Sequence, residues 1–164
     1  MELPKPTPEH DWLARLVGEW TFEHECQMGP DQPPFKSGGT QSTQAVGPLW
    51  IVGEMLGAGP DGEMGRSLIT LGYDPARKRF VGTFVTSCMT HLWIYDGALD
   101  VERRVLTLDA EGPSFAGDGT MTPFQDIFES IDADHYTLSS RYRAADGTWV
   151  SFMTGLYTRK PVAS

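Results

Sequence analysis

The segment over residues 86–93 carries the densest group of reactive side chains in the chain. Within it, Cys88 and His91 stand three positions apart. A cysteine and a histidine whose side chains meet can form an activated thiolate. On one continuous strand, however, residues three apart point to opposite faces, so this pair would converge only through a bulge or a turn. We therefore predict no catalytic residues here. We expect His91 to be either a ligand contact inside a barrel or a hydrogen-bonding residue at a strand end.

A second polar group lies on two later runs of strand-like sequence. Period-two alternation places Phe124, Asp126 and Phe128 on one face of the run over residues 124–129. A carboxylate between two phenylalanines needs a partner if that face is buried. Arg141, from the next run, is the candidate partner. We predict an Asp126–Arg141 pair that either orients a polar ligand group or fixes the register of the two strands.

Other kinds of chemistry have little support in the residue pattern. The four histidines are scattered, with no spacing typical of a metal site, and no phosphate-binding loop occurs. The two cysteines, Cys26 and Cys88, do not form a recognisable metal-binding or disulfide pattern, so we predict two free thiols. We expect no metal site. The sequence leaves catalysis open and favours a protein that is not an enzyme.

Ten short strand-like runs, separated by turns rich in Gly, Pro and Asp, must position these residues. The first begins near Trp20, and the others cover residues 38–47, 49–57, 65–73, 79–88, 92–99, 104–110, 120–131, 135–143 and 148–159. The connections are too short for helical crossovers, so neighbouring strands should pair antiparallel in an up-and-down order. An all-β closed barrel of about ten strands is predicted, because closure removes two exposed sheet edges. A two-sheet sandwich is the alternative.

A short helix is predicted in front of the strands, over residues 8–17. Thr7 is a suitable N-cap, and apolar residues recur at helical spacing until Gly18. A helix of this length is marginal alone, so we expect it to pack at one end of the barrel. Residues 1–7 are predicted to form a loose tail.

Length and charge limit the remaining possibilities. The 164 residues suit one domain over 1–164, with the barrel over 18–160. A net charge of −9 argues against a nucleic-acid partner. No apolar run approaches the roughly 18 residues that a membrane span needs, and the first residues do not resemble a signal peptide. We therefore predict no membrane partner and a cytoplasmic location.

Several motifs together resemble the bacterial "domain of unknown function 1579" family. They lie at residues 16–20, 47–54, 69–75, 80–84, 89–97 and 146–149, which spread over nearly the whole chain. The resemblance implies a calycin-like β-barrel with no established activity.

Two weaker resemblances concern the first strand. Gly18-Glu19-Trp20 is similar to the lipocalin Gly-x-Trp motif, whose tryptophan packs at the closed end against a late arginine, here Arg159. The layout also resembles nitrobindin-like haem barrels, but the residues after Trp20 depart from their glycine-rich signature.

The interior is predicted to hold a ligand among aromatic and methionine side chains, although the same residues could fill a solid core. The predicted ligand-binding residues are His91, Trp93, Asp126, Arg141, Trp149, Trp50 and Met89. The first hypothesis is a module that binds a small apolar or amphipathic molecule without a cofactor. The second is a haem-binding protein or small-molecule enzyme that uses His91 with Asp126 and Arg141. The third is a structural barrel with a solid core, which includes the case of a homodimer.

Overall fold

The structure is a computed structural model that describes residues 1–27, 29, 31–59, 61–100, 102 and 104–161. Residues 162–164, at the end of the predicted 1–164 domain, lie outside the described residues. The elements, in chain order, are α1 (Pro8–Ala14), β1 (Gly18–Cys26), β2 (Phe35–Val46), β3 (Trp50–Ala58), β4 (Met64–Asp74), β5 (Arg79–Thr86), β6 (Trp93–Leu99), β7 (Val105–Pro113), β8 (Met121–Asp132), β9 (His135–Arg143) and β10 (Trp149–Arg159).

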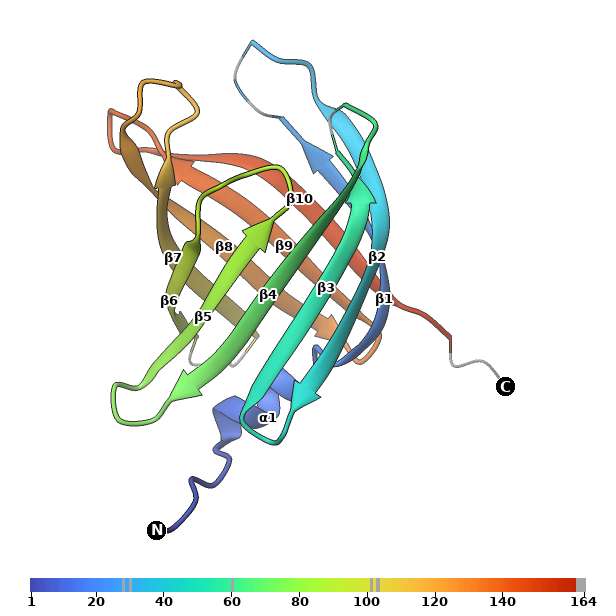
Figure 1. Cartoon of the computed structure of the whole chain (residues 1–164), viewed down its shortest axis with the longest axis vertical. Coiled ribbons are helices and arrows are strands. Elements are labelled where there is room, and N and C mark those ends of the chain that lie inside the picture. The colour runs from blue at the N-terminus through green and yellow to red at the C-terminus, as the bar shows by residue number, and fades with distance from the viewer. Residues whose placement is uncertain (28, 30, 60, 101, 103, 162–164) are drawn as a thin grey trace.

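The ten strands form one closed antiparallel barrel (Figure 1). Each strand pairs with its neighbours in the chain, and β1 pairs with β10 to complete the ring. This order confirms the predicted up-and-down barrel and excludes the two-sheet sandwich. Short turns between consecutive strands allow only antiparallel neighbours, and closure gives each described strand a neighbour on both sides.

Helix α1 is shorter than the predicted helix over residues 8–17. It ends at Ala14, and the backbone amides of residues 15–17 donate hydrogen bonds to carbonyls three residues earlier. Gly18 then adopts a φ of +136°, a value that side-chain-bearing residues rarely adopt. The chain therefore needs a tight turn at this point in order to pass from the helix axis into β1.

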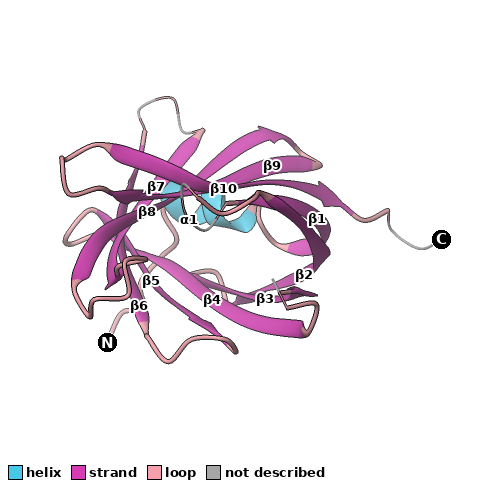
Figure 2. Ribbon diagram, turned by 90° about the horizontal axis from the view of Figure 1, so that it is seen from above, coloured by secondary structure: helices cyan, strands magenta, loops and turns pink. Residues whose placement is uncertain are grey.

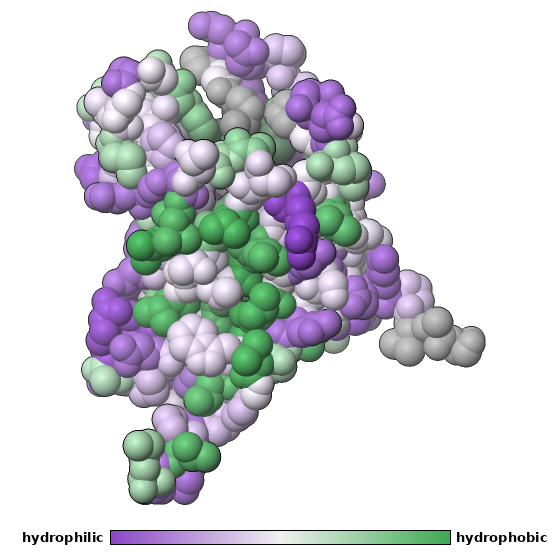
Figure 3. Space-filling model, viewed as in Figure 1, coloured by the Kyte–Doolittle hydropathy of each residue, from purple (hydrophilic) through white to green (hydrophobic). Residues whose placement is uncertain are grey.

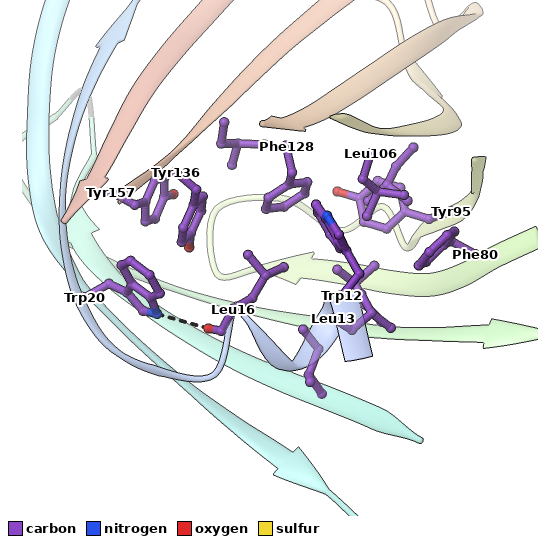
Figure 4. Close-up of a cluster of buried hydrophobic side chains, with 14 of the residues drawn as sticks. Trp12, Leu13, Leu16, Trp20, Phe80, Tyr95, Leu106, Phe128, Tyr136 and Tyr157 are labelled. Carbon is purple, nitrogen blue, oxygen red and sulfur yellow. Dashed lines mark hydrogen bonds between the residues drawn. The ribbon is translucent and has the colours of Figure 1, made fainter. Parts of the chain in front are cut away.

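Helix α1 packs at one end of the barrel, as the sequence predicted, and is visible through the ring of strands from above (Figure 2). Figure 4 shows that Trp12, Leu13 and Leu16 meet aromatic side chains of the strands in one buried cluster. The indole Nε1 of Trp20 donates a hydrogen bond of 3.0 Å to the carbonyl oxygen of Leu16, which joins the helix to β1. This closed-end cluster comprises Trp12, Leu13, Leu16, Trp20, Phe80, Leu106, Tyr136 and Tyr157.

Arg159 covers Trp20 from the last strand. Its guanidinium carbon lies 4.2 Å from the centroid of the Trp20 ring, a cation–π distance. The same guanidinium donates hydrogen bonds to the backbone carbonyls of Val17 at 2.8 Å, Ala133 at 3.1 Å and Arg15 at 3.2 Å. The packing expected from the Gly-x-Trp motif is therefore confirmed for Trp20 and Arg159.

The outer wall has apolar side chains of its own. Figure 3 shows them gathered over β3, β4 and β5. Among the exposed ones are Leu56, Val85 and Ile94, and Ile94 is 64% exposed. Because alternate residues of a strand point to opposite faces, these side chains contribute nothing to the interior.

Gly18→Ala should lower the free energy of unfolding by roughly 1–3 kcal/mol, since the backbone is strained for any residue with a Cβ. A Cβ at this position would also lie 2.3 Å from Nη1 of Arg159, which the Val17 carbonyl holds in place. Urea unfolding measures the effect. The matched control is Gly65→Ala in β4, where the nearest atoms lie 3.6 Å from an added Cβ. Equal stability of the two variants would contradict the strain argument.

Candidate functional site

A cavity of about 280 Å³ occupies the barrel between the closed-end cluster and the opposite, open end. Its walls come from strands all around the ring and from the loops after β5 and β7, because every strand points alternate residues inward. The apolar lining residues are Met55, Ile69, Phe84, Met89, Trp93, Ala110, Phe115, Phe124, Phe128, Leu138, Phe152 and Met153. The polar ones are His24, Gln41, Tyr95, Asp126 and Ser140.

Aromatic rings in edge-to-face contact form one wall of the cavity. The Trp93 and Phe124 ring centroids are 4.9 Å apart, and Phe115 lies 4.9 Å from Phe152, both pairs being nearly perpendicular. Trp93 packs against Gly112 of β7, where an added Cβ would come within 2.1 Å of the indole. The missing side chain at Gly112 therefore lets a large aromatic residue stay close to the wall and leaves the centre of the barrel open.

The carboxyl group of Asp126 lies inside the barrel. It accepts a hydrogen bond of 2.6 Å from Ser140 Oγ, and its second oxygen accepts one from the Tyr95 hydroxyl. Burial raises the pKa of Asp126, and these two hydrogen bonds oppose part of the rise. Burial, together with the charge of Asp126, raises the pKa of Tyr95 well above 10, so that the phenol stays a donor.

The predicted Asp126–Arg141 pair does not form. Asp126 stands opposite Ser140 in the β8–β9 ladder, and Arg141 stands opposite Gln125. Arg141 therefore points to the outer face, where its Nε donates to Gln125 Oε1 at 2.8 Å. The predicted pairing of Asp126 with Arg141 was therefore wrong by one residue. In a β-sheet, a difference of one residue places a side chain on the opposite face.

A second polar pair lies on the wall formed by β1 and β10. The Nε2 of His24 is 2.8 Å from the Tyr157 hydroxyl, which also approaches the Met55 sulfur at 3.8 Å. Burial lowers the pKa of His24 from 6.5 to about 4, so the ring is neutral at physiological pH. His24 was not among the predicted site residues. Its alternation with Trp20 and Phe22 was the signal that could have placed it inside.

Two further predicted residues, Met89 and Trp93, line the cavity. His91 does not. Its Nε2 hydrogen-bonds to the backbone carbonyl of Glu111 at 2.8 Å, and its ring meets the Trp93 ring at a right angle, with centroids 4.8 Å apart. His91 thus contacts Trp93 without lining the cavity itself. This matches the second of the two roles predicted for it, a hydrogen-bonding residue at a strand end.

The last two of the predicted ligand-binding residues, Trp50 and Trp149, lie on the outer face of the barrel. Trp50 is 44% exposed and packs against Gly72. It points outward because the inward residues of β3 are Ile51, Gly53 and Met55. Trp149 is 36% exposed, with the Arg141 guanidinium 4.9 Å from its ring centroid.

The position of Trp149 depends on an irregularity in β10. The register shifts between Ser151 and Met153, and both Phe152 and Met153 line the cavity. A β-bulge interrupts the alternation of faces along a strand. Simple alternation from Met153 would have placed Trp149 inside.

Within the described part of the chain, no three His, Cys, Asp or Glu side chains gather as a metal site would require. Cys26 and Cys88 are free thiols, as predicted. Burial, with a smaller effect of the Glu25 charge, raises the pKa of the Cys26 thiol, which disfavours the reactive thiolate. Among the described helices, none has the length and apolar character needed to cross a bilayer.

Comparison with known proteins identifies the fold and a family. The family model described as "Protein of unknown function (DUF1579)" matches residues 5–159. The crystal structure of Rv2717c from M. tuberculosis is 17% identical, with 96% of this chain and 100% of that chain covered and a TM-score of 0.68. The S-type phycobiliprotein lyase CPES from Guillardia theta is 11% identical, with coverage of 97% and 96% and a TM-score of 0.63.

A third similar structure, of EF1p2_mFAP2b bound to DFHBI, is 13% identical, with coverage of 92% and 98% and a TM-score of 0.50. At these identities the structures show a shared fold. No curated protein matches the sequence.

The lowered pKa of His24 predicts a loss of stability in acid. Between pH 6.5 and about 4 the unfolded chain binds a proton at His24 that the folded chain does not, so the free energy of unfolding falls as the pH falls. Protonation of His24 should lower the free energy of unfolding by about 2–3 kcal/mol near pH 4. His24→Gln should reduce the dependence of the free energy of unfolding on pH, as measured by urea unfolding between pH 6.5 and 4.

The control is His91→Gln, at a histidine outside the cavity. Its free energy of unfolding should fall with pH as that of the wild type does. An unchanged pH profile in His24→Gln would show that His24 does not cause it.

Proposed function

Since the chain belongs to the DUF1579 family, whose description names no activity, we propose a function from the cavity itself: the protein binds a small, largely apolar molecule inside the open half of the barrel. The observation that carries the proposal is the combination of a plugged end and a hollow end. The helix and the closed-end cluster fill one half of the interior, whereas aromatic and methionine side chains surround an unfilled space in the other.

The cavity is suited in size to a molecule of one or two rings. Ligand pockets are roughly 300–1,000 Å³, and an engineered apolar cavity of about 150 Å³ binds benzene. The 280 Å³ here lies between these values. Binding sites of this kind combine apolar walls with a few polar groups that fix orientation, which is the pattern of Asp126, Ser140 and His24. A similar barrel bound to DFHBI agrees with this use of the fold.

The geometry gives less support to the alternative of haem binding or catalysis through His91, Asp126 and Arg141. Of these three residues, Asp126 alone lines the cavity, while His91 and Arg141 make their hydrogen bonds elsewhere. A fully solid core, the third hypothesis, describes the helix end of the barrel and not the open half. Binding without covalent chemistry is therefore the function we propose.

A neutral, polarity-sensitive dye with two rings, 6-propionyl-2-(dimethylamino)naphthalene, tests the proposal. The wild-type protein should bind it saturably, with a shift of its emission to shorter wavelength. Ala110 lines the cavity, so Ala110→Phe should weaken binding at least tenfold by occupying part of that space. The matched control, Ala98→Phe, makes the same change at an exposed position of β6 and should leave binding unchanged.

Thermal unfolding would first establish that both variants fold, with Ala110→Leu as the substitute if the phenylalanine is not tolerated. The proposal fails if the wild type shows no saturable binding, or if folded Ala110 variants bind the dye as the wild type does.

A further inference from the structure

Among the described residues, the carboxyl group of Asp126 has only two hydrogen-bond donors and keeps free acceptor capacity. One oxygen accepts from Ser140 and the other from Tyr95, and each carboxylate oxygen has two lone pairs. One acceptor position on each oxygen therefore remains. Asp126 also belongs to the cavity lining, so a ligand in the cavity is within reach of these positions.

Among the described residues, no cation pairs with this carboxyl group. Arg and Lys are absent from the described residues that line the cavity. The cation predicted as its partner, Arg141, is bonded to Gln125 on the outer face. A buried carboxylate without a cation is costly, since attraction to an opposite charge is what normally offsets the loss of hydration.

The other polar groups of the cavity are neutral and already paired. His24 is bonded to Tyr157 and is uncharged at neutral pH, because burial lowers its pKa to about 4. Gln41 donates to the Thr43 hydroxyl at 3.0 Å. Among the described lining residues, Asp126 is thus the group that can present a charge to a ligand, and that charge is negative.

We propose that the ligand carries one protonated nitrogen, as a primary or secondary amine on a compact aromatic or alicyclic body, and that Asp126 binds this nitrogen. The inference rests on the proposed function, to which it adds the ligand class. The ammonium group donates a charge-assisted hydrogen bond to the free acceptor positions of the carboxylate, and the apolar body contacts the aromatic wall. An anionic ligand would meet repulsion from Asp126 as well as from a chain of net charge −9.

Ligand binding and ionisation of Asp126 are coupled. Burial raises the pKa of Asp126, whereas an ammonium group in hydrogen-bonding contact would lower it again by favouring the charged form. The hydroxyls of Ser140 and Tyr95 already point their hydrogens at the carboxyl group, which prepares it for the ionised state.

Two probes of nearly the same shape test the inference: 1-naphthylmethylamine, protonated at pH 7, and the neutral 1-naphthylmethanol. Calorimetric titration of the wild-type protein should show at least tenfold tighter binding of the amine. Asp126→Asn keeps the size of the side chain and should reduce this preference to about one. Asp126→Leu, which is apolar and branches at the same carbon, should do the same and provides a second variant if Asn impairs folding.

Asp109→Asn is the matched control, because Asp109 lies on the outer face, bonded to Gln125 Nε2, and its loss changes the net charge equally. It should keep the preference for the amine. The inference would be overturned if the wild type bound the two probes equally, or if the Asp126 variants kept the preference for the amine. Saturable binding of the dye would in that case still support the proposed binding cavity. Absence of binding by the dye and by both probes would instead overturn the proposed function.

Discussion

The side chain of Arg159 joins four parts of the chain at the closed end of the barrel. It lies at the end of β10, stacks on Trp20 of β1, and donates hydrogen bonds to carbonyls in the helix exit and in the β8–β9 turn. These bonds satisfy the backbone carbonyls of Arg15, Val17 and Ala133 at the barrel end. The contact with Trp20 adds a side-chain link to the β1–β10 pairing at this end, and the closed interior depends on that pairing.

Closure of the ring and packing of the helix divide the interior into two halves of different character. At the helix end, large rings pack against one another, with the Tyr136 and Tyr157 rings stacked at 4.5 Å and Trp20 perpendicular to Tyr136 (Figure 4). Such packing leaves little free volume. At the other end the described chain has no helix to fill the ring, so the same alternation of inward residues encloses a cavity. One fold therefore provides a densely packed end and a cavity.

The polar groups of the hollow half are arranged at a cost to stability. A carboxyl group, a phenol, a serine hydroxyl and a histidine lie among apolar side chains, and burial shifts the pKa values of Asp126, Tyr95 and His24 away from their ordinary values. Removing polar and charged groups from water costs free energy that apolar side chains do not incur. Local departures of this kind are expected at functional sites, where binding rather than stability governs the choice of residue. The cavity and its polar groups thus support the same functional conclusion.

The sequence alone determined the architecture of this protein. Period-two alternation, turn residues and short connections predicted ten antiparallel strands, closure and a helix at one end, because these features depend on local backbone chemistry and on the need to bury strand edges. Asp126, Trp93 and Met89, which were predicted from the sequence as interior residues, line the cavity. The resemblance to the Gly-x-Trp motif matched Arg159 to Trp20.

Only the tertiary structure decided which residues meet. The β8–β9 register placed Ser140 opposite Asp126 in place of Arg141, and closure of the ring brought the Tyr95 hydroxyl of β6 to the same carboxyl group. The bulge in β10 placed Trp149 on the outer face. A shift of one residue changes neither the composition nor the alternation of a strand, yet it exchanges every cross-strand partner. Register and bulges are fixed by packing around the whole ring, and for that reason the site required the structure whereas the barrel did not.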